Sequence, residues 1–179
     1  IVGMPRSGTT LLESIVSMNS EVLDLGEINA FERSFKEWKE KKGKVDLVDL
    51  YMQRINKELK SHITTNKWLY NYQYAGIIAS QIPNSKIIHC YRNPLDNILS
   101  IYRTNFAKDN EYSSSLIDCA KIYLDHKQIM KEYKKRFPEN IYDLNYDLLV
   151  KNPDKEIKSL INWLGWKWNK AYLNPHLSK

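Results

Sequence analysis

Cysteine and long apolar runs are both scarce in this sequence. The 179 residues include only two cysteines, Cys90 and Cys119, and we expect both to be buried free thiols, because they form no disulfide or metal-binding pattern. The four histidines have no metal-ligand spacing. The longest apolar runs are too short to cross a bilayer. We therefore expect neither a metal centre nor a membrane segment in this chain.

A signal peptide is also missing, and a strong charge imbalance is absent. We expect a cytoplasmic protein, whereas a removed N-terminal signal or anchor would place it in a lumen. The net charge of +6 suits an anionic ligand. Many lysines fall in blocks, at residues 36–44 and 131–135, which we interpret as solvated helix faces. Because no nucleic-acid-binding motif accompanies them, we expect no nucleic-acid partner.

The length and the order of elements indicate one α/β domain. Residues 1–179 suffice for a single core, and we expect a domain truncated at both ends, because the chain starts without methionine inside an apolar strand. Strands are expected at the N-terminus and near residues 22–27, 66–69, 86–91 and 140–144, and helices near 9–18, 31–42, 46–59, 72–81, 94–106, 113–136 and 153–165. This alternation predicts a three-layer fold, with a mainly parallel central sheet and helices on both faces.

The most informative stretch is Gly3-Met4-Pro5-Arg6-Ser7-Gly8-Thr9-Thr10, where an apolar strand enters a glycine loop and then a helix. Such a turn directs backbone N–H groups and the positive end of a helix dipole at one spot, where anions bind. The glycine spacing is that of a P-loop, but Thr9 replaces the lysine of nucleoside-triphosphate-binding loops. A cation is present inside the loop instead, as Arg6. The alternative interpretation is an ordinary strand-to-helix turn.

Ionisable residues lie at four of the expected strand ends: Arg6 after the first strand, Glu27 shortly after the first helix, Lys67 in the next strand and Arg92 after Tyr91. The ligand site of a parallel α/β sheet lies beyond the carboxyl ends of its strands, so we expect these side chains to converge. Kinases and triphosphatases need the P-loop lysine and an acid that holds Mg²⁺, yet the clearest apolar strand ends in Tyr91 and Arg92. The set therefore favours transfer of a group from a phosphate-bearing donor without a metal.

Five segments carry a resemblance to a known family: Pro5 to Leu11, Gly26-Glu27, Asn66-Lys67, Tyr91-Arg92-Asn93-Pro94 with Ser100, and Tyr146-Asp147 before the last helix. With these segments the chain resembles the P-loop sulfotransferases, which transfer a sulfuryl group from 3′-phosphoadenosine 5′-phosphosulfate (PAPS). It is most similar to the tyrosylprotein sulfotransferases and to bacterial sulfotransferase domains joined to tetratricopeptide repeats. The resemblance covers nearly the whole chain and implies a sulfotransferase-type fold.

The resemblance also implies a role for each site residue. The residues that would bind the 5′-phosphosulfate are Pro5, Arg6, Ser7, Gly8, Thr9 and Thr10. Arg92 and Ser100 would bind the 3′-phosphate, and Tyr146 would contact the nucleotide. Lys67 would neutralise the leaving oxygen, Glu27 would take the proton of the acceptor hydroxyl, and Arg6 would assist catalysis. The product of the donor is adenosine 3′,5′-bisphosphate, and no metal is implied.

Simpler interpretations stay open for four of these residues. Arg6 could be a surface loop residue, and Glu27 could cap the following helix. Lys67 could be a solvated strand-edge lysine, and Arg92 could pair with Asp96 at the next turn. For the whole chain, the alternatives are a nucleotide or small-molecule kinase and a non-catalytic nucleotide-binding module. A peptide tyrosine, a glycan and a small alcohol or amine are all candidate acceptors, because acceptor contacts come from variable loops. The resemblance is compatible with a homodimer and with a tetratricopeptide-repeat region in the full-length protein.

Overall fold

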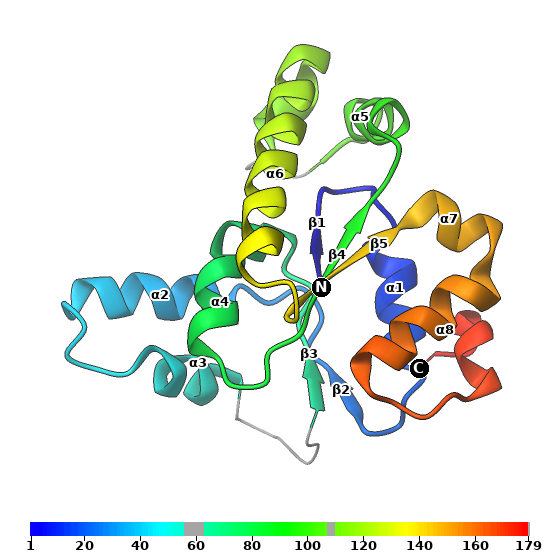
Figure 1. Cartoon of the computed structure of the whole chain (residues 1–179). Coiled ribbons are helices and arrows are strands. Elements are labelled where there is room, and N and C mark those ends of the chain that lie inside the picture. Colours follow the sequence, from blue (N-terminus) through cyan, green and yellow to red (C-terminus); the bar gives the residue numbers. More distant parts are fainter. Residues whose placement is uncertain (56–62, 107–109, 179) are drawn as a thin grey trace.

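The computed structural model describes residues 1–55, 63–106 and 110–178 (Figure 1). Three of its strands form a parallel sheet in the order β1-β4-β5, with bounds Val2–Gly3, Ile87–Tyr91 and Ile141–Asn145. In this sheet Val2 lies opposite His89, and Ile87 lies opposite Ile141. A second parallel pair joins β2 (Val22–Asp24) to β3 (Ile63–Thr65). The Ile1 nitrogen donates to the carbonyl oxygen of Asn66 at 2.8 Å and so connects the two sheets.

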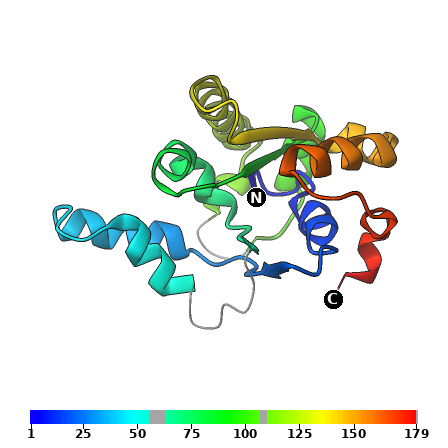
Figure 2. The ribbon, with the colours of Figure 1, turned by 60° about the horizontal axis from the view of Figure 1, so that its bottom comes forward.

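Helices cover both faces of the three-stranded sheet (Figure 2). On one face, α1 (Thr9–Val16) and α8 (Pro153–Leu164) bury their apolar sides against Ile88 and Leu144. On the other face, α4 (Ala75–Gln81) and α6 (Leu116–Arg136) pack against Ile87 and Ile141. Successive residues of a strand point to opposite faces, so a strand buried on both faces is a continuous apolar run. The predicted three-layer α/β fold is confirmed.

Two helices, α2 (Ala30–Glu40) and α3 (Leu47–Ile55), form an arm that projects from the sheet (Figure 1). Its base is aromatic: the buried ring of Phe31 lies 5.6 Å from Tyr51 and 5.7 Å from Tyr74. The Asp46 carboxylate accepts from the first N–H groups of α3 and caps it. The remaining elements are η2 (Leu69–Tyr74), α5 (Pro94–Tyr102), η3 (Glu111–Ser114), α7 (Tyr146–Lys151), η4 (Lys170–Leu173) and η5 (Pro175–Leu177).

Several predicted bounds are wrong for local reasons. The strand expected at 66–69 lies earlier in the chain, as β3, and ends at Thr65. Asn66 turns the chain there, because its side-chain oxygen accepts from the Trp68 N–H at 2.8 Å. The helix expected from residue 72 is divided into η2 and α4, and the helix expected to reach residue 106 stops at Tyr102. The helix expected from 113 starts at Leu116, where Ser115 caps it. Residues 56–59 of the helix expected at 46–59 lie outside the described residues.

One helix was not predicted. The segment Tyr146–Lys151 forms α7, which directly follows β5. The side-chain oxygen of Asn145 accepts from the N–H groups of Asp147 and Leu148, at 2.8 and 3.1 Å, and caps this helix. The cap therefore sets the position of Tyr146 at the carboxyl end of the sheet.

Both cysteines are buried free thiols, as predicted. Burial raises the pKa of Cys90 to about 12, and its Sγ donates to the carbonyl oxygen of Ser7 at 3.0 Å. Among the described residues, no helix is both long enough and apolar enough to cross a membrane.

Two histidines lie in the core between β4 and α6, with ring centroids 5.0 Å apart. His89 shares a hydrogen bond with Asp143 at 2.8 Å, which confirms its predicted role as a hydrogen-bonded core residue. Asp143 also accepts from Lys134. His126 is 2% exposed, and burial, assisted by His89, lowers its pKa to about 3. Tyr72 packs on its other side, with ring centroids 4.6 Å apart, so His126 is enclosed by aromatic rings, and among the described residues no acid contributes to its lowered pKa.

His126 makes folding sensitive to acid. A histidine of the unfolded chain binds a proton below pH ~6.5, whereas folded His126 stays neutral down to about pH 3. Stability is therefore unaffected by this group above pH ~6.5 and falls as the pH drops, by up to about 1.4 kcal/mol per pH unit. We expect His126→Gln to reduce the pH dependence of the free energy of unfolding between pH 6.5 and 4.5. The free energy is measured by urea unfolding, and the exposed control is His176→Gln. Equal slopes in the two variants would contradict this assignment.

Candidate functional site

The glycine loop between β1 and α1 is held against α5. The Asn97 side chain donates to the carbonyl oxygen of Pro5 at 2.9 Å, and Asn97 is fully buried. Arg6 adopts a left-handed backbone conformation, with φ of 66°. Its Nε donates to the hydroxyl oxygen of Ser100, two turns into α5, at 3.2 Å. The structure therefore joins two predicted donor-binding residues that are 94 positions apart in the sequence.

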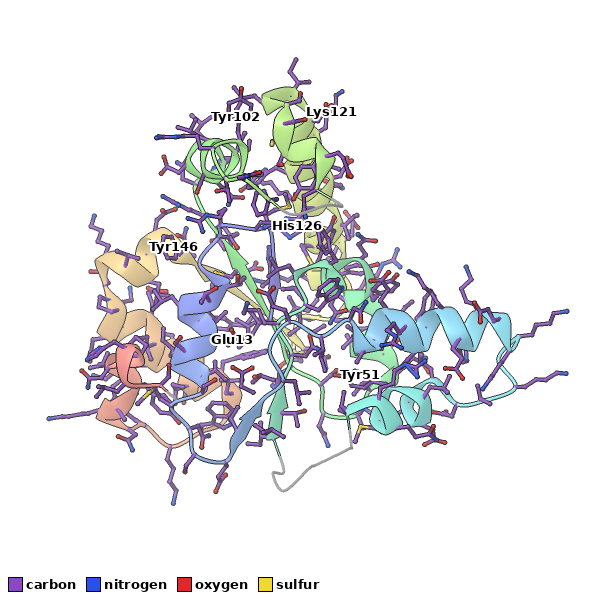
Figure 3. All side chains as sticks on the ribbon, turned by 180° about the vertical axis from the view of Figure 1, so that it is seen from behind. Glu13, Tyr51, Tyr102, Lys121, His126 and Tyr146 are labelled. Atoms are coloured by element: carbon purple, nitrogen blue, oxygen red, sulfur yellow. The ribbon has the colours of Figure 1, made fainter. Side chains whose placement is uncertain are left out.

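Gly8 precedes α1 and lies in direct contact with Tyr146. A Cβ atom added to Gly8 would be 2.1 Å from Cδ2 of the Tyr146 ring, and the Gly8 φ of 97° also disfavours a side chain. The Arg92 guanidinium lies over the Tyr146 ring, 5.3 Å from the ring centroid. Figure 3 shows Tyr146 beside the start of α1. Three predicted nucleotide-contacting residues thus meet at the carboxyl ends of β1, β4 and β5.

Arg92 pairs with Asp147 and not with Asp96, the partner in the simpler alternative. Asp147 Oδ1 lies 3.8 Å from Arg92 Nε, and the described residues show no ion pair between Arg92 and Asp96. The other oxygen of Asp147 accepts from the Asn93 N–H at 2.7 Å, which fixes the carboxylate. Within the described part of the chain, Arg92 Nε is buried and has no hydrogen-bond partner. The Ser100 hydroxyl accepts from Arg6 and not from Arg92. The N–H at Arg92 Nε therefore has no acceptor among these residues and can donate to a ligand.

The loop residues differ in exposure. Ser7 and Thr9 are buried, whereas Arg6 and Thr10 are exposed. The first N–H groups of a helix have no partner within it, so those of α1 can bind an anion together with Arg6. Ser7 Oγ is likewise buried and unpaired among the residues described. No three His, Cys, Asp or Glu side chains in residues 1–55, 63–106 and 110–178 lie close enough together to hold a metal ion.

Lys67 and Glu27 are brought together from neighbouring strand ends. The Lys67 N–H donates to the carbonyl oxygen of Gly26 at 2.9 Å, which places the two side chains side by side. The Lys67 ammonium donates to the Glu27 carboxylate. The Lys67 side chain is 5% exposed and that of Glu27 is 59% exposed. Lys67 is therefore not a solvated strand-edge lysine, and Glu27 has a partner other than the helix terminus.

A second acid at Lys67 was missed in the sequence. Glu13 Oε2, on α1, lies 3.4 Å from Lys67 Nζ, and the Glu13 side chain is 14% exposed. Burial raises the pKa of Glu13, and Lys67 opposes that rise. A signal was available, because Glu13 interrupts the apolar residues Leu12, Ile15 and Val16 of a short helix that starts at the glycine loop. An acid in such a segment needs a buried cation.

The fold and the site together define an α/β protein with a glycine loop at the start of a helix and a buried lysine just beyond the carboxyl end of a parallel strand. The chain belongs to the sulfotransferase family, which matches residues 1–170. A protein of Aquifex aeolicus (strain VF5) is 32% identical over 203 residues, which cover 100% of this chain and 27% of that protein. The chain thus spans about a quarter of the length of this relative.

Three solved structures share the fold. They are the sulfotransferase domain from the curacin biosynthetic pathway (TM-score 0.74, 18% identity, 100% of this chain and 77% of that chain), the sulfotransferase domain from the Synechococcus PCC 7002 olefin synthase (0.75, 15%, 100% and 76%) and a sulfotransferase from Alicyclobacillus acidocaldarius (0.61, 16%, 93% and 80%). The expected sulfotransferase-type fold is confirmed.

Proposed function

We propose that this chain transfers a sulfuryl group from PAPS to an acceptor hydroxyl or amine. The observation that carries the proposal is the buried ammonium of Lys67, which is held by Glu27 and by Glu13 of α1, the helix that starts at a glycine loop with no lysine of its own. The reaction requires a cation near the transferring group, and we assign this task to Lys67. Membership of the sulfotransferase family supports the same reaction class.

The donor-binding roles fit the chemistry of the residues present. The N–H groups that start α1 and the Arg6 guanidinium suit a 5′-phosphosulfate, because both donate to anionic oxygens. In the described chain Arg92 Nε has no hydrogen-bond partner, and Arg92 lies against Tyr146, which suits a 3′-phosphate next to an aromatic contact with the nucleotide. Ser100 would contribute to donor binding by holding the Arg6 side chain in position.

The chemical step assigns one task to each of two residues. The acceptor oxygen forms a new bond to sulfur while the bond from sulfur to the bridging phosphate oxygen breaks. Glu27 takes the acceptor proton, and its exposed side chain is accessible to an acceptor from solvent. Lys67 stabilises the negative charge that develops on the departing oxygen, which is electrostatic stabilisation of the transition state.

Calorimetry without metal tests the donor assignment. We expect adenosine 3′,5′-bisphosphate to bind at least ten-fold more tightly than adenosine 5′-phosphate, because Arg92 contributes a charge-assisted contact to the additional phosphate. Arg92→Met should remove the difference, and the exposed control Arg103→Met should retain it. Equal affinities of the wild-type chain for the two nucleotides would overturn the assignment of Arg92.

Mass spectrometry with PAPS and a panel of acceptors tests the reaction itself. The panel contains a tyrosine peptide, a sulfatable oligosaccharide and small alcohols and amines. Sulfuryl transfer adds a net SO₃, roughly 80 Da, to the acceptor. We expect product in the presence of a metal chelator. Transfer of phosphate from ATP in the presence of Mg²⁺ would favour the kinase alternative, and tight nucleotide binding without any product would favour the non-catalytic module.

A further inference from the structure

Lys67 is shared by two carboxylates in very different environments. The Glu27 side chain is 59% exposed and follows β2, where it can rotate into solvent. The Glu13 side chain is 14% exposed and is fixed on the second turn of α1 (Figure 3). Lys67 itself is 5% exposed, so its ammonium has little access to water. One partner of the lysine can move away, whereas the other cannot.

We propose that Glu13 is a positioning residue that holds the Lys67 ammonium in place when Glu27 turns to the acceptor. This inference rests on the proposed function. One oxygen of the Glu27 carboxylate accepts from the Lys67 ammonium, so a turn of Glu27 towards the acceptor breaks this contact. Once Glu27 has taken the acceptor proton it is neutral, and it no longer balances the charge of the lysine. Glu13 then supplies the negative charge that keeps the Lys67 ammonium directed at the departing oxygen.

The surroundings of Glu13 support this division of labour. Burial raises the pKa of Glu13, Lys67 lowers it, and the neighbouring carboxylate of Asp24 raises it further. Asp24 is itself fixed, because it accepts from the Gly26 N–H at 2.8 Å and from the Thr65 hydroxyl at 3.4 Å. Among the described residues, Glu13 Oε1 is buried and has no hydrogen-bond partner that meets ordinary geometry. Burying a carboxylate in this way costs stability, and the ion pair with Lys67 offsets that cost.

Glu13→Gln tests the proposal, because the amide keeps the size of the side chain and removes its charge. We expect kcat to fall ten- to a hundred-fold, while the Kd for adenosine 3′,5′-bisphosphate changes less than two-fold, since Glu13 does not contact the donor. Glu13→Asp keeps the charge and should recover part of the loss. The matched control is Glu40→Gln on the exposed side of α2, which should keep the wild-type kcat.

A double-mutant cycle separates positioning from general damage. If Glu13 acts through Lys67, then Glu13→Gln lowers kcat in the wild-type background and has no further effect in Lys67→Met. The proposal is overturned if kcat of Glu13→Gln equals that of the wild type, or if the substitution lowers kcat by the same factor in both backgrounds. If Glu13→Gln does not fold, the same cycle with Glu13→Asp decides. Failure of the proposed function is a separate result, because the wild-type chain would then form no sulfated product.

Discussion

Lys67→Met should lower kcat for sulfuryl transfer by about 10²–10³, equivalent to roughly 3–4 kcal/mol of transition-state stabilisation. The ammonium is almost fully buried between two carboxylates, so no nearby solvated cation can replace it. The Kd for adenosine 3′,5′-bisphosphate, measured by calorimetry, should change by less than about three-fold, because the charge that Lys67 stabilises develops only during the reaction.

Stability must be measured in the same variant. Removing Lys67 leaves the Glu13 carboxylate buried without its cation, which we expect to cost about 1–3 kcal/mol in the free energy of unfolding. The matched control is Lys134→Met, which removes another paired lysine, on α6, where it donates to Asp143. The control should keep kcat. A loss of activity in Lys134→Met as large as that in Lys67→Met would show that instability, not chemistry, explains the effect.

Gly8→Ala should reduce the affinity for adenosine 3′,5′-bisphosphate by at least 100-fold. The new methyl group would be 2.1 Å from the Tyr146 ring, so either the glycine loop or Tyr146 must move. Both carry predicted donor contacts, and the N–H groups of the loop lose their common direction when it shifts. The left-handed backbone of Gly8 adds strain of about 1–3 kcal/mol for any side chain. Calorimetry of the nucleotide and urea unfolding measure the two effects.

Gly165→Ala is the matched control for Gly8. Gly165 ends α8 with a φ of 77°, and a Cβ there would have nothing within 4 Å. It should therefore cost stability through backbone strain alone and leave nucleotide binding unchanged. Adding Tyr146→Ala to Gly8→Ala should restore part of the stability, because it removes the ring that the methyl group contacts. If Gly8→Ala binds the nucleotide as tightly as Gly165→Ala does, the packing of the loop against Tyr146 has no role in donor binding.

Local chemistry made much of the fold predictable. The apolar run that became β4 has no polar alternation, which is the mark of a strand covered on both faces. Asp46 at the start of α3 and Gly165 at the end of α8 marked the helix bounds, because caps act over a few residues. Errors arose where a side chain bonds to nearby backbone, as Asn66 does, since such a bond competes with the extension of a strand.

The meeting of Glu27 and Lys67 followed from topology. The parallel strands β2 and β3 end side by side, so these two residues could be expected together although 40 positions separate them. The sequence did not predict which side chains form hydrogen bonds and ion pairs. Arg6, not Arg92, bonds to Ser100, and Arg92 faces Asp147 and Tyr146. These pairs depend on the directions of the side chains, which differ by only a few ångströms in where they place the charged atoms.

The residues thus specify the elements, the order of layers and the edge at which the ligand site forms, because propensity, capping and hydrophobic patterning are local properties. The partners of Lys67 are not local. Glu13 joins the lysine only because α1 packs beside the end of β3, and that packing buries one carboxylate and leaves Glu27 exposed. Burial and pairing depend on every element around a site, so the difference between a buried and an exposed carboxylate emerges only when the chain is folded.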